Sequence, residues 1–291
     1  MSGVDTGQRI RRVTWVGFVA NMLLAALKIS AGWLGGSRAV LADGVHSLSD
    51  GATDVAILVG SRFWLAPADE NHPHGHRRLE TLVTLGIGLF LAVVAGGIVV
   101  DAVGALREPG GTSPEPIAAI AAAVSILVKE SLYRWTAREG RRVRSTALVA
   151  NAWHHRSDAF SSLPALISVV AAIVMPRWAF VDFVGALVIS AFVLHSAWII
   201  VAPAVAQLID RGAGSEVETQ LQTIAESTTG VHNTHALRTR YLGGGLAVDL
   251  HVRVDGACSV REGHDIAHDV RRRLEESEHD VVDVVVHIEP S

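Results

Sequence analysis

Residues 41–50 read LADGVHSLSD and lie inside an otherwise apolar run from Val40 to Leu65. His46 and Asp50 are four residues apart, so both fall on one face of a helix. Ionisable side chains in hydrocarbon each cost several kcal/mol unless they are paired, hydrated or bound to a metal ion. A polar stripe inside a segment of membrane-spanning length therefore indicates a functional site.

The same spacing recurs about a hundred residues later, where His154 and Asp158 begin another long apolar run. One imidazole and one carboxylate from each of two helices complete a tetrahedral site for a divalent cation. The alternative is that each pair is an intrahelical hydrogen bond that tolerates burial. Counting at helical rise places the first pair about 15 Å from Arg38 and the second about 18 Å from Arg144. Antiparallel helices would bring both pairs to one level, which favours metal ligation.

The composition is that of an integral membrane protein. The chain has 291 residues, 49% of them hydrophobic, with a mean hydropathy of +0.34, and soluble domains are seldom so apolar over long stretches. The net charge of −4 gives no support to nucleic-acid binding. Cys258 is the only cysteine, which excludes an intramolecular disulfide and a cysteine-based zinc site. The first apolar segment is too long for the core of a signal peptide.

Six apolar segments have the length of about 20 residues that a bilayer core requires. They are Val13–Leu34, Val40–Leu65, Thr81–Leu106, Ile117–Trp135, Thr146–Met175 and Phe180–Leu208. Basic residues are concentrated at the N-terminus and in two of the polar connectors between these segments. These are the second connector, between the second and third segments, and the fourth connector, between the fourth and fifth. Positive charge is retained on the cytoplasmic side, so we expect both termini in the cytoplasm of a multi-pass protein, in a bacterial inner membrane.

From Ile209 onward the pattern is that of a soluble domain. Leu246–Val254 alternates apolar and polar residues as a half-buried strand does. The predicted elements are helix Glu216–Ser227, strands His235–Tyr241 and Leu246–Val254, helix Val260–Glu276 and strand Asp280–Glu289. The fold class is thus an all-α six-helix transmembrane domain, residues 1–208, and a cytoplasmic α+β domain of order αββαβ, residues 209–291. A thin core in the second domain makes pairing with a second copy plausible.

Two further groups of residues suggest metal binding. In the second connector, Asp69, His72 and His76 can hold a metal ion, although a solvated polar turn is the alternative. In the soluble domain, His251 lies on the polar face of its strand, and His287 and Glu289 share a face. The number of histidines there favours a regulatory metal cluster over a solvated surface.

Charges elsewhere in the spans have simpler explanations. We expect a structural or orienting role at helix ends, or snorkelling towards them, for Lys28, Asp101, Lys129, Glu130 and Asp182. Asp43 suits the lining of an exit path, and Asp54 a pair with a neighbouring helix. By position and sign, Arg77 or Arg78 can pair with Asp210.

With these motifs, the chain resembles the cation diffusion facilitator family over nearly its whole length. The resemblance is carried by residues 42–50, by residues 67–76 and by His154-His155-Arg156-Ser157-Asp158. It implies a homodimeric transporter, not an enzyme, with a metallochaperone-like (ferredoxin-like) cytoplasmic domain, which exports a divalent metal against inward proton flow. By position it assigns the transport site to His46, Asp50, His154 and Asp158, the loop site to Asp69, His72 and His76, and the cytoplasmic site to His235, His251, His264, His287 and Glu289.

The donor types narrow the choice of metal. Two imidazoles and two carboxylates favour Zn2+, as cargo and as a regulatory ion, over Mn2+, and leave Fe2+, Co2+ and Cd2+ open. Two rival functions use the same residues. One is a membrane-embedded metallohydrolase, which needs an open coordination position and a separate base. The other is a membrane-tethered metal sensor.

Overall fold

A computed structural model describes residues 3–107, 113–142 and 146–291, without the side chains of residues 3–10, 50, 52–54, 56–58, 61, 146, 147 and 150. Within these limits the chain divides into two compact units. The first comprises residues 1–58 and 86–200, and the second residues 59–85 and 201–291.

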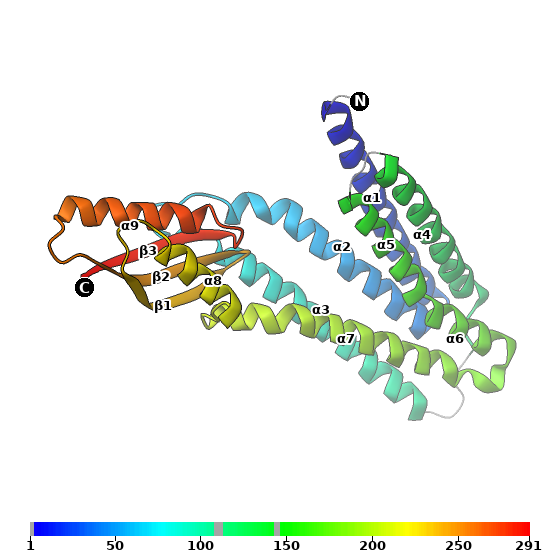
Figure 1. Cartoon of the computed structure of the whole chain (residues 1–291). Coiled ribbons are helices and arrows are strands. Elements are labelled where there is room, and N and C mark those ends of the chain that lie inside the picture. The colour runs from blue at the N-terminus through cyan, green and yellow to red at the C-terminus, as the bar shows by residue number, and fades with distance from the viewer. Residues whose placement is uncertain (1–2, 108–112, 143–145) are drawn as a thin grey trace. The chain divides into compact units, whose positions relative to one another are not determined.

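Long helices form most of the chain (Figure 1). They are α1 (Gly3–Leu34), α2 (Arg38–Trp64), α3 (Arg78–Arg107), α4 (Pro116–Arg142), α5 (Thr146–Ser161), α6 (Leu163–Val174), the 3-10 turn η1 (Pro176–Trp178) and α7 (Phe180–Leu208). The six predicted spans correspond to these helices, except that the fifth is broken into α5 and α6 at Ser162. Pro164 explains the break, because proline lacks an amide N–H and its ring clashes with the carbonyl four residues earlier.

Five stretches of the described helices are long and apolar enough to cross a membrane. They are Arg11–Leu34, Arg78–Arg107, Pro116–Arg142, Asn151–Val174 and Pro176–Leu208. Helix α2 has the length, 27 residues, but its apolar run is interrupted by Asp43, Asp50 and Asp54. The helix that carries the first polar stripe is thus not among these five stretches.

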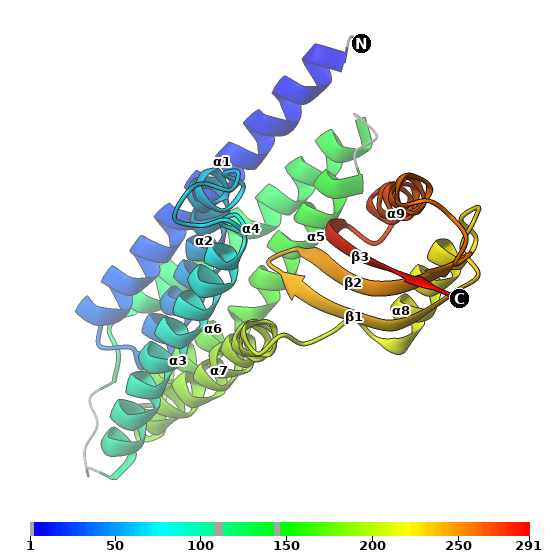
Figure 2. The ribbon, with the colours of Figure 1, turned by 90° about the vertical axis from the view of Figure 1, so that its left-hand side faces the viewer.

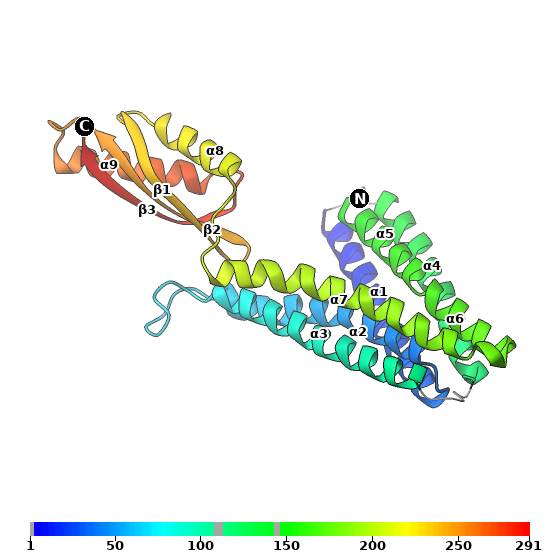
Figure 3. The same cartoon turned by 90° about the horizontal axis from the view of Figure 1, so that it is seen from below.

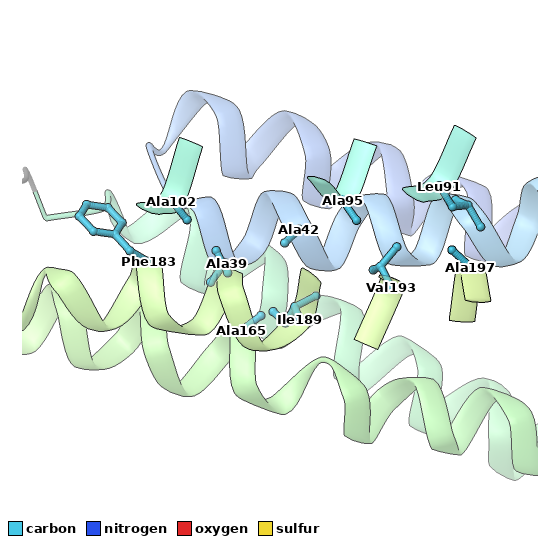
Figure 4. Close-up of a cluster of buried hydrophobic side chains, with 11 residues drawn as sticks. Ala39, Ala42, Leu91, Ala95, Ala102, Ala165, Phe183, Ile189, Val193 and Ala197 are labelled. Carbon is cyan, nitrogen blue, oxygen red and sulfur yellow. The ribbon is translucent and has the colours of Figure 1, made fainter. Parts of the chain in front are cut away.

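The core of the first unit is built largely from alanine (Figure 4). Ala39 and Ala42 of α2 face side chains of α3 and α7, including Ala95 and Val193, and most are entirely buried. Small side chains let helix backbones approach closely, which is how helices associate in lipid.

Asp182 of α7 anchors the start of α2. Its carboxylate, fully buried, accepts hydrogen bonds from Ser37 Oγ at 2.6 Å and from the backbone N–H of Arg38 at 2.7 Å. The Arg38 side chain in turn pairs with Asp101 of α3. These contacts satisfy an N–H that would otherwise be unpaired in the first turn, so Asp101 and Asp182 have the structural role predicted for them.

The second unit contains a three-stranded sheet with β2 in the middle (Figure 2). Its elements are α8 (Ser215–Glu226), β1 (Asn233–Leu242), β2 (Gly245–Val254), α9 (Val260–Glu275) and β3 (Val281–Pro290), which is the predicted αββαβ order. β1 pairs antiparallel and β3 parallel to β2. Leu246, Val248, Leu250 and Val252 of β2 form one core with residues of α8 and α9. The helices therefore cover one face of the sheet and leave the other open.

The first turn of α3 contacts two loops of the same unit, one before α8 and one between β1 and β2. Arg78 pairs with Asp210 at 2.7 Å, and Glu80 accepts a hydrogen bond from the backbone N–H of Gly244 at 3.2 Å. Of the two arginines considered for Asp210, the structure pairs Arg78. Both partners are about half exposed, so the pair stabilises the fold by about 1 kcal/mol at most.

Candidate metal centres

The transport-site residues lie on α2 and α5. His46 is half buried, and its Nδ1 atom has no hydrogen-bond partner among the described residues. His154 is exposed, whereas Asp158, one turn further along α5, is buried, and 3.7 Å separate His154 Nδ1 from Asp158 Oδ1. The side chain of Asp50 lies outside the described residues, so only three members of the predicted site are located.

A buried ionic network adjoins these residues. Lys28 of α1 donates to Asp43 Oδ2 at 3.0 Å and to Ser47 Oγ at 2.5 Å, both on α2. Lys129 of α4 approaches the same Ser47 Oγ at 3.3 Å and Asp158 Oδ2 at 3.2 Å. Both lysines are almost completely buried, so the prediction that they lie at helix ends or snorkel is wrong.

The network links α2 to α5 next to the candidate ligands. Ser47 follows His46 directly in the sequence, and the contacts run from Ser47 through the Lys129 ammonium to Asp158. Asp43 has both carboxylate oxygens occupied, Oδ2 by Lys28 and Oδ1 by the Ser162 hydroxyl at 2.9 Å. It is therefore a structural group here, and not the lining of an exit path.

Sequence reasoning missed these lysines as parts of the site. A signal was present, because two lysines in apolar runs need two carboxylates to balance them, and Asp43 and Asp158 are acids in the same apolar regions. Matching charges within the spans would have found the pairs.

The loop between α2 and α3 is seen in Figure 3. The structure brings together the three residues predicted there. Ligand atoms of Asp69, His72 and His76 all lie within 4.8 Å of one another. Asp69 Oδ1 is 3.3 Å from His72 Nδ1, and Asp69 Oδ2 is 3.3 Å from His76 Nε2. Donor atoms bound to one tetrahedral zinc ion at about 2.0–2.1 Å are separated by about 3.3 Å, so the spacing suits a metal.

Hydrogen bonds orient two of these groups. The backbone N–H of His72 donates to Asp69 Oδ1 at 2.7 Å, which lowers the pKa of Asp69 below its usual value and keeps it ionised. His76 Nδ1 lies 3.2 Å from the carbonyl oxygen of Pro67, an acceptor only, so this nitrogen carries the proton. In a neutral imidazole, His76 Nε2 then presents its lone pair towards Asp69, as a metal ligand does.

Replacing Asp69 by asparagine is expected to weaken metal binding at the loop about tenfold or more while preserving the turn. The amide oxygen still accepts the backbone N–H bonds, but the negative charge is lost. Isothermal titration of the full-length protein with Zn2+ measures the loss. Glu70→Gln, which removes a neighbouring charge outside the cluster, is the control and should leave binding unchanged.

The cytoplasmic cluster lies on the open face of the sheet. His235, His251 and His287 pair directly across β1, β2 and β3, so the three rings form one row. Glu289 Oε1 lies 2.8 Å from His251 Nδ1, and Glu289 Oε2 lies 3.2 Å from His235 Nε2. His287 Nε2 is 3.8 Å from Glu289 Oε1.

His264 does not join this row within the chain. It lies on α9, which packs against the opposite face of the sheet, and it lines a cavity of about 570 Å³ with Cys258 and Val286. Four of the five residues predicted for the cytoplasmic cluster are therefore brought together, and the sheet separates the fifth from them.

His251→Ala is expected to remove metal-dependent stabilisation of the cytoplasmic domain, because His251 is the central member of the row. The His251 hydrogen bond lowers the pKa of Glu289, so this carboxylate stays ionised on acidification. Metal binding should then weaken on acidification, because a ligating imidazole must be neutral. Thermal unfolding with and without Zn2+ at pH 7.5 and pH 5.5 measures both effects. His268→Ala on α9 is the control, and an equal loss there would contradict the assignment.

Two family models match the chain in succession. "Cation efflux transmembrane domain" matches residues 14–209, and "Cation efflux protein, cytoplasmic domain" matches residues 213–291.

Several curated proteins are similar over most of the chain. The manganese efflux system protein MneS of Bacillus subtilis is 34% identical over 275 residues, which cover 94% of this chain and 93% of that protein. The magnetosome protein MamB of Magnetospirillum gryphiswaldense is 29% identical, covering 96% of this chain and 93% of that protein. Metal tolerance protein C1 of Arabidopsis thaliana is 34% identical, and the chain spans 63% of that longer protein. The chain belongs to the cation efflux, or cation diffusion facilitator, family of membrane transporters, and it is not an enzyme.

Proposed function

We propose that this protein exports divalent metal ions from the cytoplasm, Zn2+ first among them, through a site formed by His46, Asp50, His154 and Asp158. One observation carries the proposal. Asp158 is buried on α5 and connects through Lys129 to Ser47 of α2. Ser47 follows His46, whose Nδ1 has no hydrogen-bond partner among the described residues. Buried polar atoms without partners are rare, and a metal ion supplies what this nitrogen lacks.

The donor set supports zinc. Two imidazoles and two carboxylates are the borderline ligands that suit a tetrahedral Zn2+ ion, whereas Mn2+ prefers oxygen ligands in larger number. Manganese is nevertheless the second candidate, because the relative MneS is named a manganese efflux protein. Fe2+, Co2+ and Cd2+ export by the same mechanism are the remaining alternatives.

Export is coupled to inward proton flow by alternating access around a fixed site. A metal ion arriving from the cytoplasm displaces protons from the imidazoles, since a ligating imidazole is neutral. Protonation at the outward-open face then releases the ion.

The architecture that we propose has a membrane domain over residues 1–208 and a cytoplasmic domain over residues 209–291, with both termini in the cytoplasm. The working unit is a homodimer in a bacterial inner membrane. The cytoplasmic clusters regulate it by binding the same ion. A metallohydrolase gains no support, because the family models that match the chain are those of cation efflux proteins. A metal sensor predicts normal signalling when Asp50 is replaced, whereas a transporter predicts loss of flux.

Uptake into proteoliposomes with an imposed pH gradient tests the proposal. The expected result is Zn2+ movement that depends on the gradient and exceeds Mn2+ movement, with proton flux in the opposite direction. Asp50→Ala should abolish Zn2+ flux while the protein remains folded. Native flux in that variant, or a Zn2+ flux that does not depend on the pH gradient, would overturn the proposed mechanism.

A further inference from the structure

Lys129 occupies an unusual position for a charged residue. It comes from the middle of α4, its side chain is 1% exposed, and its ammonium lies 3.2 Å from an oxygen of Asp158, a proposed metal ligand. Burying an ammonium group is costly unless a partner compensates it. The Lys129 ammonium thus places a positive charge next to a proposed ligand of the transported ion.

The two buried lysines differ in how firmly they are held. Lys28 has three acceptors, the carbonyl oxygen and the carboxylate of Asp43 and the Ser47 hydroxyl, at 2.5 to 3.1 Å. Among the side chains that the structure describes, Lys129 has two polar contacts, both longer, to Ser47 at 3.3 Å and to Asp158 at 3.2 Å. Lys28 is therefore fixed, and Lys129 is the ion-pair partner that can be displaced.

We propose that Lys129 sets the metal affinity of the transport site by acting as a tethered cation that holds Asp158 when no metal is bound. This rests on the proposed function, in which Asp158 is a ligand. An incoming divalent ion competes with the ammonium for the carboxylate. Ser47 remains as an acceptor for Lys129, so the displaced ammonium keeps one hydrogen bond.

The charges of the network explain why a lysine that competes with the metal ion would be useful. The charges of the four described members of the network, Lys28, Lys129, Asp43 and Asp158, sum to zero without metal. A divalent ion near Asp158 is repelled by the ammonium, and at short range in a medium of low dielectric constant this repulsion is strong. The lysine weakens binding and so favours release, which a transporter needs because an ion held too tightly cannot leave.

The alternative is that Lys129 only neutralises Asp158 and stabilises the fold. The two roles predict opposite results for one measurement. Loss of a structural residue lowers metal affinity or leaves it unchanged, whereas loss of a competing cation raises it.

The experiment measures Zn2+ affinity in full-length protein in which Asp69→Asn and His251→Ala disable the other clusters. Lys129→Gln should bind Zn2+ about tenfold or more tightly than this background and turn over more slowly in proteoliposomes. Lys129→Arg, which keeps the charge, should stay near the background affinity. Lys28→Gln, which removes the other buried lysine, should lower the unfolding temperature without tightening binding.

Ser47→Ala provides a second test with the opposite sign. It removes the other acceptor of Lys129, strengthens the hold on Asp158 and should weaken Zn2+ binding several-fold. Ser168→Ala, which removes a buried hydroxyl that donates to the carbonyl oxygen of Ala165, is its control.

Unchanged or weaker binding in Lys129→Gln, while Asp158→Asn abolishes binding, overturns the tethered cation and leaves the transport site intact. If Lys129→Gln does not fold, native or tighter binding in Ser47→Ala overturns it. Full binding in Asp158→Asn would instead overturn the proposed function itself.

Discussion

Replacing Asp158 by asparagine is expected to reduce metal flux by about two orders of magnitude or more, because a charged ligand is lost from the transport site. The same substitution leaves the Lys129 ammonium buried without its ion partner, which destabilises the protein by about 3 to 5 kcal/mol. Both effects are measured on one preparation, flux in proteoliposomes and unfolding temperature in detergent.

A double variant separates the two effects. Asp158→Asn with Lys129→Gln removes the stranded charge, so the unfolding temperature should return most of the way to the native value while flux stays abolished. Recovery of flux in the double variant would show that Asp158 serves only to neutralise the lysine, and it would contradict the assignment of Asp158 as a ligand.

Lys28→Met is expected to destabilise the first unit by about 3 to 5 kcal/mol. Lys28 and Asp43 form a salt bridge in which both side chains are 0% exposed, so removal of the ammonium leaves an uncompensated carboxylate in the interior. Thermal unfolding of the purified protein, followed by its tryptophan fluorescence, measures the loss.

Two comparisons make this prediction specific. Lys28→Met combined with Asp43→Asn should regain more than half of the loss, because the buried charge is gone. Arg271→Ala breaks an exposed pair with Glu275 of similar distance, 2.7 Å, and should cost less than about 1 kcal/mol. Equal losses in Lys28→Met and Arg271→Ala would contradict the importance of burial.

The fold followed from patterns that are local in the chain. Apolar length predicted the long helices, and five stretches of those described are long and apolar enough to cross a membrane. Strict alternation in Leu246–Val254 predicted the central strand, because alternation matches the geometry of a strand. The break at Ser162 was missed because the segment from Thr146 to Met175 was treated as one continuous span, and Pro164 acts on the backbone rather than on hydropathy.

The metal clusters were predictable where the ligands are neighbours in sequence or in register. Asp69, His72 and His76 share one loop, and His287 and Glu289 share one face of a strand. The position of His264 was not predictable, because placing it requires knowing which face of the sheet α9 covers. The buried lysines were misplaced for a similar reason, since hydropathy gives a residue's depth along a helix but not which neighbouring helix it meets.

X-ray absorption at the zinc edge tests the central claim most directly. The sample is full-length protein loaded with one equivalent of Zn2+, with the loop and cytoplasmic clusters disabled by Asp69→Asn and His251→Ala. We predict a four-coordinate ion with two imidazole nitrogens and two carboxylate oxygens at about 2.0–2.2 Å, reduced to one imidazole in His46→Ala. A spectrum without imidazole scattering, or one that His46→Ala leaves unchanged, would contradict the account.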